Sequence, residues 1–465
     1  MAATFVAVVF MITSLAVNDL DRSLDWDEAT YLSEALPSIA DVGFDAHRAR
    51  GIVVVAYPFH LLDTTSIAPL RIWLVLVHSV GLGIVVEIWR RIVGAPVLAS
   101  ALIFASSWLA LFYSAELSPN LLASLLLAAA LGCTLLSVRN RGRVLWAVFA
   151  VLFLAAGAFV RPTDSLWYTV GVMATALITA LPVLKVLLIA VAGLGLGWFP
   201  WVIEAELHFG GTFERLRKAS ELVSAGIGTS FKDHVLLLDG PLVGPQPSGG
   251  IPWFGVAWLA GLLVLSVTVL VRSWGGRARL ETVVPAGAAV ASAFPYVFLT
   301  GALAPRFLLP AYLALALVSG QAFGLKDRKG FVRLLVWAAA AVVAVASLWQ
   351  ITVAIDISSD QLERRQVALD LGLAIKDLSQ GTSCVVASQY GYPQIQVYSE
   401  CNGSRMTLVS PTLPEEVSAG LGEGMTAFVV FWSEAPKSSP VATWPRTIVE
   451  TSFGGVYVYR FDAPG

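Results

Sequence analysis

The stretch DWDEATYLSEALP, residues 25–37, follows an apolar run at the N-terminus and contains four acidic side chains among its thirteen residues. The chain as a whole is far less charged, because hydrophobic residues make up 57% of the 465 residues, charged residues make up 13%, and the mean hydropathy is +0.75. A soluble domain carries roughly 25% charged residues. We therefore expect an integral membrane protein whose chain leaves the bilayer at this acidic stretch.

The other apolar runs predict a polytopic α-helical membrane protein. A helix needs about 20 apolar residues to cross a bilayer, and about eleven runs are long enough. No Lys or Arg precedes the first run, which favours a first spanning helix over a cleaved signal peptide. The net charge of −2 gives no indication of a nucleic-acid partner. The runs are centred near residues 9, 80, 104, 129, 152, 175, 193, 262, 291, 314 and 343.

The basic residues between the runs fall in alternate loops, in which acidic residues are scarce. By the positive-inside rule these loops face the cytoplasm. We therefore expect a multi-pass protein of the cell (plasma or inner) membrane. Its N-terminus is then cytoplasmic, and residues 25–37, the 203–250 loop and the C-terminal tail are outside. The basic residues are Arg90, Arg91, Arg139, Arg141, Arg143, Lys185, Arg272, Arg277, Arg279, Lys326, Arg328, Lys329 and Arg333.

Two long loops of the predicted membrane domain, residues 1–355, are expected outside. The first loop, residues 19–68, contains GIVVVAYPFHLL (residues 51–62), which is too short to span the bilayer and is expected to lie along its interface. The second loop, residues 203–250, contains an amphipathic helix pattern and ends in GPLVGPQPSGG, which is typical of a mobile loop. The helix pattern is TFERLRKASELVSA, residues 212–225, with Phe213, Leu216 and Leu222 at helical spacing.

The tail, residues 356–465, has the composition of an ordinary soluble protein. Helix-like and strand-like segments alternate in it, which predicts a small extracytoplasmic α/β domain. Cys384 and Cys401 lie in this tail, where a disulfide and two free thiols both stay open. Cys133 lies in an apolar run and is expected to pack there. The predicted strands are SCVVAS (383–388), one ending in LVS (408–410), AFVVFW (427–432) and GVYVYRF (455–461), and the predicted helices include QLERRQVALDLGLAIKDL (361–378) and one starting at PTLPEEVSAG (411–420).

Asp27 and Glu28 begin a helix-like stretch at the point where the chain leaves the membrane. A carboxylate of Asp25 or Asp27 could simply cap that helix, because the backbone N–H groups of a first turn have no partner within the helix. The functional alternative is a general base or a metal ligand at a cleft near the membrane. A carboxylate there can take the proton of an acceptor hydroxyl while a sugar leaves a phosphate carrier.

The segment HRARG places His47, Arg48 and Arg50 just before the expected interfacial stretch. Guanidinium groups at the level of the lipid headgroups make forked, charge-assisted bonds to phosphate oxygens. The same side chains could instead be ordinary headgroup anchors.

Three further segments place polar side chains at the outer edges of predicted spans: FYSAELSPN (112–120), FVRPTDSLW (159–167) and ALAPRFLLPAYLAL (302–315). A charge at membrane depth costs a few kcal/mol unless it is paired or faces a cavity. Arginines and an acidic pair on one side of the membrane therefore predict a polar pocket, with Arg306 as the first candidate ligand of a donor phosphate. The polar side chains of the three segments are Glu116, Asn120, Arg161, Asp164 and Arg306.

In this order, the motifs resemble those of the GT-C glycosyltransferase superfamily, and within it those of the family 22 mannosyltransferases, which use a polyprenyl (dolichyl) phosphate mannose donor. Those enzymes carry a DE pair in the first lumenal loop, an Arg with a nearby Pro, a PN pair after the third span, an RPT and a late RFLLPA run. The chain departs from their pattern at Trp26 and at residues 303–305. The matching residues are Asp27 and Glu28, Arg50 with Pro58, Pro119 with Asn120, Arg161 with Pro162 and Thr163, and Arg306 to Pro310.

The resemblance implies a GT-C-like membrane fold and the inverting transfer of a sugar from a polyprenyl phosphate to a glycan, lipid-linked or protein acceptor of the cell envelope. Asp27 would activate the acceptor hydroxyl, with Glu28 as its neighbour or substitute. Arg306 would hold the leaving lipid phosphate with help from Arg50 or Arg161. No metal is needed if arginines bind the phosphate, although a divalent cation at the acidic residues stays open. Further substrate-binding candidates are Arg48, Tyr31, His47 and Asn120.

Two other functions stay open. A secondary transporter would place polar residues near the middle of the membrane on broken helices, whereas most charges here are expected at the outer edges. A GT-C-like protein without activity would not need the acidic pair, which this chain retains. The sequence does not specify the transferred sugar, which could be a hexose such as mannose or glucose, or a pentose such as arabinose.

Overall fold

The computed structural model describes most of the chain, and several expected features lie outside the described residues. These are Leu36 and Pro37 of the acidic stretch, residues 60–62 and 224–225, most of the Gly/Pro-rich loop, Ala302, the strand ending in LVS, residues 411–412, and five basic residues: Arg141, Arg277, Lys326, Arg328 and Lys329. The described residues are 1–35, 44–59, 67–139, 143–179, 181–223, 226–243, 250–273, 279–301, 303–325, 330–388, 391–405, 413–437, 439–452 and 454–462.

Contacts divide the chain into two compact units. Unit 1 comprises Met1–Asn18, Asp45–Gly51 and Trp73–Ile357, and unit 2 comprises Asp19–Phe44, Ile52–Ile72 and Ser358–Gly465. The border after Ile357 lies close to the predicted border at residue 355. Unit 2 nevertheless also contains two segments of the first predicted loop, so the acidic stretch belongs to the same unit as the tail.

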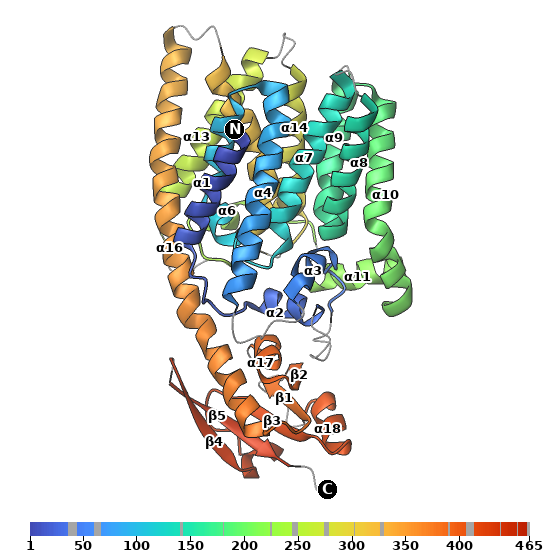
Figure 1. Cartoon of the computed structure of the whole chain (residues 1–465), viewed down its shortest axis with the longest axis vertical. Helices are drawn as coiled ribbons and strands as arrows, with labels where there is room; N and C mark the ends of the chain where they lie inside the picture. The colour runs from blue at the N-terminus through green and yellow to red at the C-terminus, as the bar shows by residue number, and fades with distance from the viewer. Residues whose placement is uncertain are drawn as a thin grey trace. The chain divides into compact units, whose positions relative to one another are not determined.

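Unit 1 is built from helices. α7 is buried along most of its length and packs against α8, α9, α14 and α15, so it occupies the middle of the helices around it (Figure 1). The helices with residues in unit 1 are α1 (Ala2–Val17), α4 (Ala68–Val93), α5 (Val97–Ala105), α6 (Trp108–Tyr113), α7 (Pro119–Arg139), α8 (Arg143–Val160), α9 (Pro162–Ile178), α10 (Val183–His208), α11 (Thr212–Leu222), α12 (Phe231–Leu236), α13 (Trp253–Ser273), α14 (Arg279–Phe298), α15 (Leu309–Ser319) and α16 (Gly330–Ser379), with the 3-10 helices η2 (Pro305–Leu308) and η3 (Gly320–Gly324).

All eleven predicted span centres fall within helices, but the count of eleven spans is not confirmed. Within the described part of the chain, seven helices are long and apolar enough to cross a membrane. α1 and α8 are apolar but shorter. The run centred near residue 104 is interrupted between α5 and α6, where the Ser107 side chain accepts a hydrogen bond from the Ala110 N–H and begins a new helix. Serine favours this capping position, and the surrounding apolar residues conceal the break from a hydropathy pattern.

α9 and α14 lie side by side (Figure 1) and approach each other at two glycines. A methyl group on Gly171 would lie 2.4 Å from the carbonyl oxygen of Gly287. Small residues at such a contact allow helix backbones to approach closely, which is how helices gain van der Waals energy inside a membrane. The close approach matters for the site, because each of these helices contributes a polar side chain at its end.

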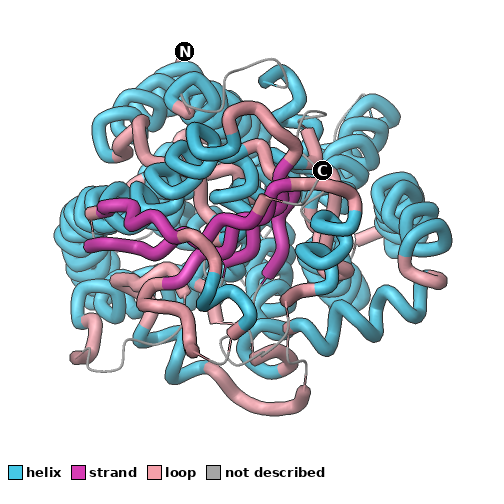
Figure 2. The backbone as a smooth tube through the Cα atoms, turned by 90° about the horizontal axis from the view of Figure 1, so that it is seen from below, coloured by secondary structure: helices cyan, strands magenta, loops and turns pink. Residues whose placement is uncertain are grey.

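Unit 2 contains a five-stranded sheet with the order β2-β1-β3-β5-β4, seen as magenta strands in Figure 2. β1 pairs in parallel with β2 and β3, whereas β5 pairs antiparallel with β3 and β4. The other elements with residues in unit 2 are α2, α3, α17, α18, two 3-10 helices, the start of α4 and the end of α16. Bounds are Trp26–Ser33 for α2, Gly51–Ala56 for α3, Tyr57–Phe59 for η1, Cys384–Ser388 for β1, Tyr392–Ser399 for α17, Asn402–Arg405 for β2, Glu415–Gly422 for α18, Thr426–Phe431 for β3, Pro440–Thr443 for η4, Arg446–Thr451 for β4 and Gly454–Phe461 for β5.

The predicted segments of the tail can be compared with this sheet. SCVVAS, AFVVFW and GVYVYRF coincide with β1, β3 and β5, and the predicted helices coincide with the end of α16 and with α18. β4 was not expected, and most of its side chains are exposed, as befits an edge strand. Cys384 and Cys401 form a disulfide that joins the start of β1 to the residue before β2. This resolves the alternative that the sequence left open.

Candidate functional site

Arg161 and Asp164 lie at the start of α9, where Pro162 occupies the first helical turn and sets the helix entry. The Arg161 Nε donates to Asp164 Oδ2 at 3.1 Å. A second guanidinium nitrogen of Arg161 donates to the Tyr296 hydroxyl at 3.0 Å, and that hydroxyl donates to Asp164 in turn. Tyr296 lies near the end of α14, so the paired α9 and α14 bring the three side chains together.

Arg306 lies on η2, and its side chain reaches the same cluster. The Arg306 guanidinium stands 5.2 Å from the centre of the Phe307 ring, and the Arg161 guanidinium stands 5.4 Å from it. Phe307 also stacks on Tyr296, with 5.0 Å between ring centres. An arginine over an aromatic face gains about 0.5–2 kcal/mol, depending on its desolvation. The structure therefore brings together two of the predicted arginines around one phenyl ring.

Arg306 also reaches α6, which precedes the predicted Asn120. Its Nη1 donates to the Tyr113 hydroxyl at 3.4 Å. Asn120 is buried in the first turn of α7, where its Oδ1 accepts a hydrogen bond from Ser118 at 3.1 Å. No side chain or backbone group of the described residues bonds the Asn120 Nδ2. Since η2 contacts both α6 and α7, Asn120 belongs to the surroundings of Arg306.

His78 is a buried residue of this region that the sequence did not indicate. Its Nδ1 lies 2.8 Å from the Ser114 carbonyl oxygen, in the turn between α6 and α7. The Nε2 has no hydrogen-bond partner among the described residues. His78 lies within the apolar run of α4, and a single histidine in such a run gives no signal of its surroundings.

Arg50 makes an ion pair with a residue outside the predicted set. Its Nε lies 2.5 Å from Glu204 Oε1, and the buried Arg215 lies 2.8 Å from the other Glu204 oxygen. Arg215 also donates to the carbonyl oxygens of Ala46, Arg48 and Trp201. Burial lowers the pKa of Arg215, but an arginine stays protonated in proteins. Arg215 therefore fixes the Asp45–Gly51 segment on α10.

Through its last residue, the same segment also contacts the two residues before the predicted RPT motif. A methyl group on Gly51 would lie 2.6 Å from the Phe159 carbonyl and from the Val160 Cα, directly before Arg161. Of the other candidates on this segment, Arg48 is buried, with its Nε 3.5 Å from Asp45, and His47 is exposed.

In unit 2, α2 begins with a capping box formed by Asp25 and Glu28. The Asp25 N–H donates to Glu28 Oε2 at 2.9 Å. Asp25 therefore takes the capping role that the sequence left open between Asp25 and Asp27. Asp27 is half-buried in the first turn of α2, and Tyr31, one turn further on, packs edge-on against Phe44.

Glu28 is also the centre of a buried ion-pair cluster. Arg71 and Arg365 each place a guanidinium nitrogen 3.1 Å from Glu28 Oε2, and all three side chains are almost fully buried. Arg71 further donates to the carbonyl oxygens of Arg22 and Ser23. These bonds hold the Glu28 carboxylate in a structural position. Breaking a buried ion pair by removing one partner typically costs about 3–5 kcal/mol.

Tyr398 connects this cluster to α17. Its hydroxyl accepts a hydrogen bond from the Leu24 N–H at 2.8 Å. Burial raises the pKa of Tyr398 to about 12, so the hydroxyl stays neutral at physiological pH. The segment leading into α2 is thus tied to the tail by main-chain and side-chain bonds within unit 2.

The predicted residues therefore fall into three groups. Arg161 and Arg306 meet at Phe307, with Asn120 near them. Arg50 pairs with Glu204 and shares its segment with His47 and Arg48. Asp27, Glu28 and Tyr31 belong to unit 2. The convergence of Asp27 and Arg306 on one substrate stays a prediction. Among the described residues, no three His, Cys, Asp or Glu side chains gather as a metal site would require.

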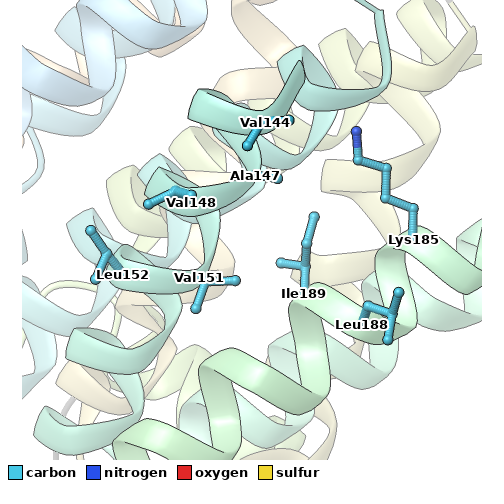
Figure 3. Close-up of a pocket in the computed structure, with 8 residues that line it drawn as sticks. All are labelled: Val144, Ala147, Val148, Val151, Leu152, Lys185, Leu188 and Ile189. Atoms are coloured by element: carbon cyan, nitrogen blue, oxygen red, sulfur yellow. The ribbon is translucent and has the colours of Figure 1, made fainter. Parts of the chain in front are cut away.

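A groove of about 430 Å³ lies between α8 and α10 (Figure 3). Apart from Lys185, all the side chains that line it are apolar, and the Lys185 ammonium donates to the Ser137 carbonyl oxygen at 2.6 Å. A sugar phosphate needs several convergent polar groups, so this groove does not have the chemistry of the predicted pocket. None of the predicted site residues lines it. The lining residues are Val144, Ala147, Val148, Val151, Leu152, Lys185, Leu188 and Ile189.

No protein-family model matches the chain, and no curated protein matches it. Solved structures do. ArnT from Cupriavidus metallidurans, bound to undecaprenyl phosphate, matches with a TM-score of 0.68 and 13% identity over 98% of this chain and 97% of its own. The oligosaccharyltransferase of Archaeoglobus fulgidus matches with a TM-score of 0.54 and 12% identity over 92% of this chain and 69% of its own.

The arabinofuranosyltransferase AftD from Mycobacteria matches with a TM-score of 0.55 and 16% identity, over 99% of this chain and 41% of its own. At 12–16% identity the likeness to these structures shows the fold, which agrees with the predicted GT-C-like membrane fold. The finer likeness to family 22 mannosyltransferases is not confirmed.

Proposed function

We propose that the chain is an inverting glycosyltransferase that moves a sugar from a polyprenyl-phosphate donor to an acceptor outside the cytoplasm. The observation that carries the proposal is the pair of guanidinium groups, Arg161 and Arg306, held at one aromatic ring. Two half-buried cations at the end of a membrane helix bundle suit a phosphate whose lipid tail lies in the bilayer. Arg50 is the weaker third ligand, because Glu204 already balances its charge.

The proposed reaction is a single displacement at the anomeric carbon. The acceptor hydroxyl oxygen forms a bond to that carbon while the bond from the carbon to the phosphate oxygen breaks. Asp27 takes the hydroxyl proton, and the polyprenyl phosphate leaves with the bonding electrons. Arg306 and Arg161 neutralise the charge that develops on the leaving phosphate. Attack from the face opposite the phosphate inverts the anomeric configuration.

The surroundings of Glu28 make it the less suitable base of the acidic pair. Glu28 accepts bonds from two buried arginines and from the Asp25 N–H, so its oxygens are already engaged. A carboxylate between two cations is a poor base, because both favour its ionised form. Asp27 is half-buried. The proposal requires that Asp27 come within reach of the acceptor hydroxyl.

The fold neighbours support a lipid-linked donor. One of them was solved with undecaprenyl phosphate, and the names of two others describe the transfer of an oligosaccharide and of arabinofuranose. The disulfide between Cys384 and Cys401 supports an oxidising, extracytoplasmic location for the tail. The sugar of this chain's donor, with mannose as the family 22 likeness implies, and the acceptor are left to experiment.

The test uses the full chain in lipid nanodiscs with a panel of polyprenyl-phosphate sugars (mannose, glucose and arabinose) and envelope glycans as acceptors. Asp27→Asn and Arg306→Gln are each expected to lower the rate of polyprenyl-phosphate release by about 100-fold or more. Arg446→Gln, which removes an exposed arginine of β4, is the control and is expected to be neutral. Binding of undecaprenyl phosphate, measured by native mass spectrometry, should weaken in Arg306→Gln and persist in Asp27→Asn.

Two outcomes contradict the proposal. If wild-type protein binds no undecaprenyl phosphate and uses no donor of the panel, the chain is not this kind of transferase. If Asp27→Asn transfers sugar at the wild-type rate, Asp27 is not the base. Movement of an intact lipid-linked sugar across the membrane without release of polyprenyl phosphate would instead favour a transporter.

A further inference from the structure

α11 carries large apolar side chains that the described part of the chain leaves exposed. Phe213 is 88% exposed, Leu216 is 45% exposed and Leu222 is 56% exposed. On a helix with 100° per residue, Phe213 and Leu216 lie about 60° apart and form one apolar sector, whereas Leu222 lies on the other side of the charged residues. Burying large apolar side chains is worth about 1.5–3 kcal/mol each, so an uncovered face of this kind indicates a partner outside the chain.

A neighbouring sector of α11 is charged and internally paired. Arg217 makes ion pairs with Glu214 and with Glu221, at 2.6 and 2.5 Å. The Glu214 carboxylate holds the pKa of Arg217 above its usual range, and the Arg217 bonds hold the pKa of Glu214 below its own. Lys218 completes this sector and lies 3.9 Å from Glu214. The charged sector of the helix therefore suits water, and the Phe213–Leu216 sector suits hydrocarbon.

The apolar face of α11 follows directly after an exposed apolar surface of α10. Leu196, Phe199, Ile203 and Leu207 are exposed along α10, which is one of the helices long and apolar enough to span a membrane. The chain then turns at Gly210 and Gly211, whose φ angles of 81° and 118° only glycine adopts readily. After this turn α11 runs crosswise to α10 instead of continuing it (Figure 1).

Arg215, the buried side chain of α11, holds the turn and the helix in place. Its guanidinium stands 4.4 Å from the centres of both the Trp201 and the Phe209 rings, and it is fully buried by the contacts described above. Arg215 therefore fixes the orientation of α11 about its own axis, and with it the direction in which Phe213 and Leu216 point.

We propose that α11 is a membrane-interface helix, whose Phe213–Leu216 face is buried among the lipids of the outer leaflet while its charged sector faces water. This face follows directly after the exposed apolar surface of α10, a helix that can span the membrane. The bilayer, rather than a second protein, is therefore the partner that we expect to cover it. An amphipathic helix at the interface buries its apolar face to about the boundary between headgroups and acyl chains. The proposal does not depend on glycosyl transfer.

The proposal is tested by the depth of single labels on the two sectors of α11. Phe213→Cys and Leu216→Cys probe the apolar sector, and Lys218→Cys and Glu221→Cys are matched controls on the charged sector. Cys133 is the one cysteine outside the disulfide and is buried in α7, so unmodified protein serves as the labelling blank. The full chain is spin-labelled in single-copy lipid nanodiscs, and its accessibility to oxygen and to a water-soluble nickel complex is measured.

We expect the labels at positions 213 and 216 to be more accessible to oxygen than to the nickel complex, which gives a positive depth parameter. The labels at 218 and 221 should be more accessible to the nickel complex, which gives a negative one. The same sign at all four positions would overturn the proposal. So would labels at 213 and 216 that neither reagent reaches, because a protein partner and not lipid would then cover the face. Since all four positions are exposed in the structure, labelling is not expected to disturb folding.

Discussion

Arg161 and Arg306, which are 145 residues apart in the chain, hold their guanidinium groups at 5.4 and 5.2 Å from the centre of one ring, that of Phe307. Two like charges at one ring repel each other, and the structure offsets this in two ways. Asp164 pairs with Arg161 at 3.1 Å, and the π-face of Phe307 attracts cations. Under the proposed function, a donor phosphate would bind at this pair of guanidinium groups.

Phe307 is therefore expected to contribute to phosphate binding although it carries no charge. Phe307→Leu keeps an apolar side chain but removes the ring from both arginines. At roughly 1 kcal/mol for each cation–π contact, the Kd for undecaprenyl phosphate should rise by about tenfold or more. The measurement is a titration in nanodiscs followed by native mass spectrometry. Phe254→Leu removes a ring that stacks on Trp349 and should leave the Kd unchanged; an equal effect of both substitutions would contradict the role of Phe307.

Glu28 is expected to stabilise the fold. Glu28→Gln leaves the buried Arg71 and Arg365 without their common carboxylate, and the free energy of unfolding should fall by about 3–5 kcal/mol. Thermal unfolding followed by fluorescence-detected size exclusion would show the loss. Glu363→Gln, at an exposed position on α16, is the control. If Glu28→Gln kept full stability and abolished transfer, Glu28 and not Asp27 would be the base.

Gly51 is expected to tolerate no side chain. Gly51→Ala places a methyl group 2.6 Å from the backbone of Phe159 and Val160, and because backbone cannot rotate away, the cost should be about 1–3 kcal/mol. The substitution should also weaken phosphate binding, since Arg50 and Arg161 flank this contact. Gly195→Ala in α10 has nothing within 4 Å of the new methyl group and should be neutral or slightly stabilising. Equal melting temperatures for the two variants would contradict the prediction, because they would show that the 45–51 segment shifts to make room for the methyl group.

His234 is expected to make stability depend on pH. Burial lowers the pKa of His234 below its ordinary value of 6.5, and its Nε2 lies 3.1 Å from the Tyr296 carbonyl oxygen. The folded state therefore binds this proton less readily than the unfolded chain. The stabilising contribution is complete above about pH 6.5 and is lost as the pH falls below it.

Melting temperatures between pH 8 and pH 5 would measure the effect. His234→Gln retains a donor for the Tyr296 carbonyl but does not titrate in this range, so its melting temperature should fall less steeply with acid than that of the wild type. His208→Gln, at an exposed position at the end of α10, should follow the wild type. If the melting temperature of His234→Gln fell with pH as steeply as that of the wild type, the pH dependence would come from other groups.

The positions of the helices followed from the sequence, because bilayer thickness sets a minimum length for an apolar run. The break between α5 and α6 did not, because Ser106 and Ser107 are two small residues within such a run. Strands β1, β3 and β5 were visible as apolar segments, whereas β4 is an edge strand whose exposed side chains carry no such pattern.

The candidate site was only partly predictable. Isolated charges at the edges of apolar runs pointed to Arg161 and Arg306, but their meeting at Phe307 depends on tertiary packing. Adjacent residues illustrate the limit: Arg364 is 65% exposed and pairs with Asp360, whereas Arg365 is 4% exposed and pairs with Glu28. Both belong to one polar stretch of a helix, and no local pattern distinguishes them. Arg71 and Arg215 were missed for the same reason.

Arg215 donates hydrogen bonds to the main-chain carbonyl oxygens of residues 46 and 48. These hydrogen bonds do not involve the side chains of Ala46 and Arg48, so a substitution at either position would keep the bonds to Arg215 only where the new side chain fits its buried surroundings. The anchorage of the segment depends on the Arg215 guanidinium and on Glu204, which pairs with it.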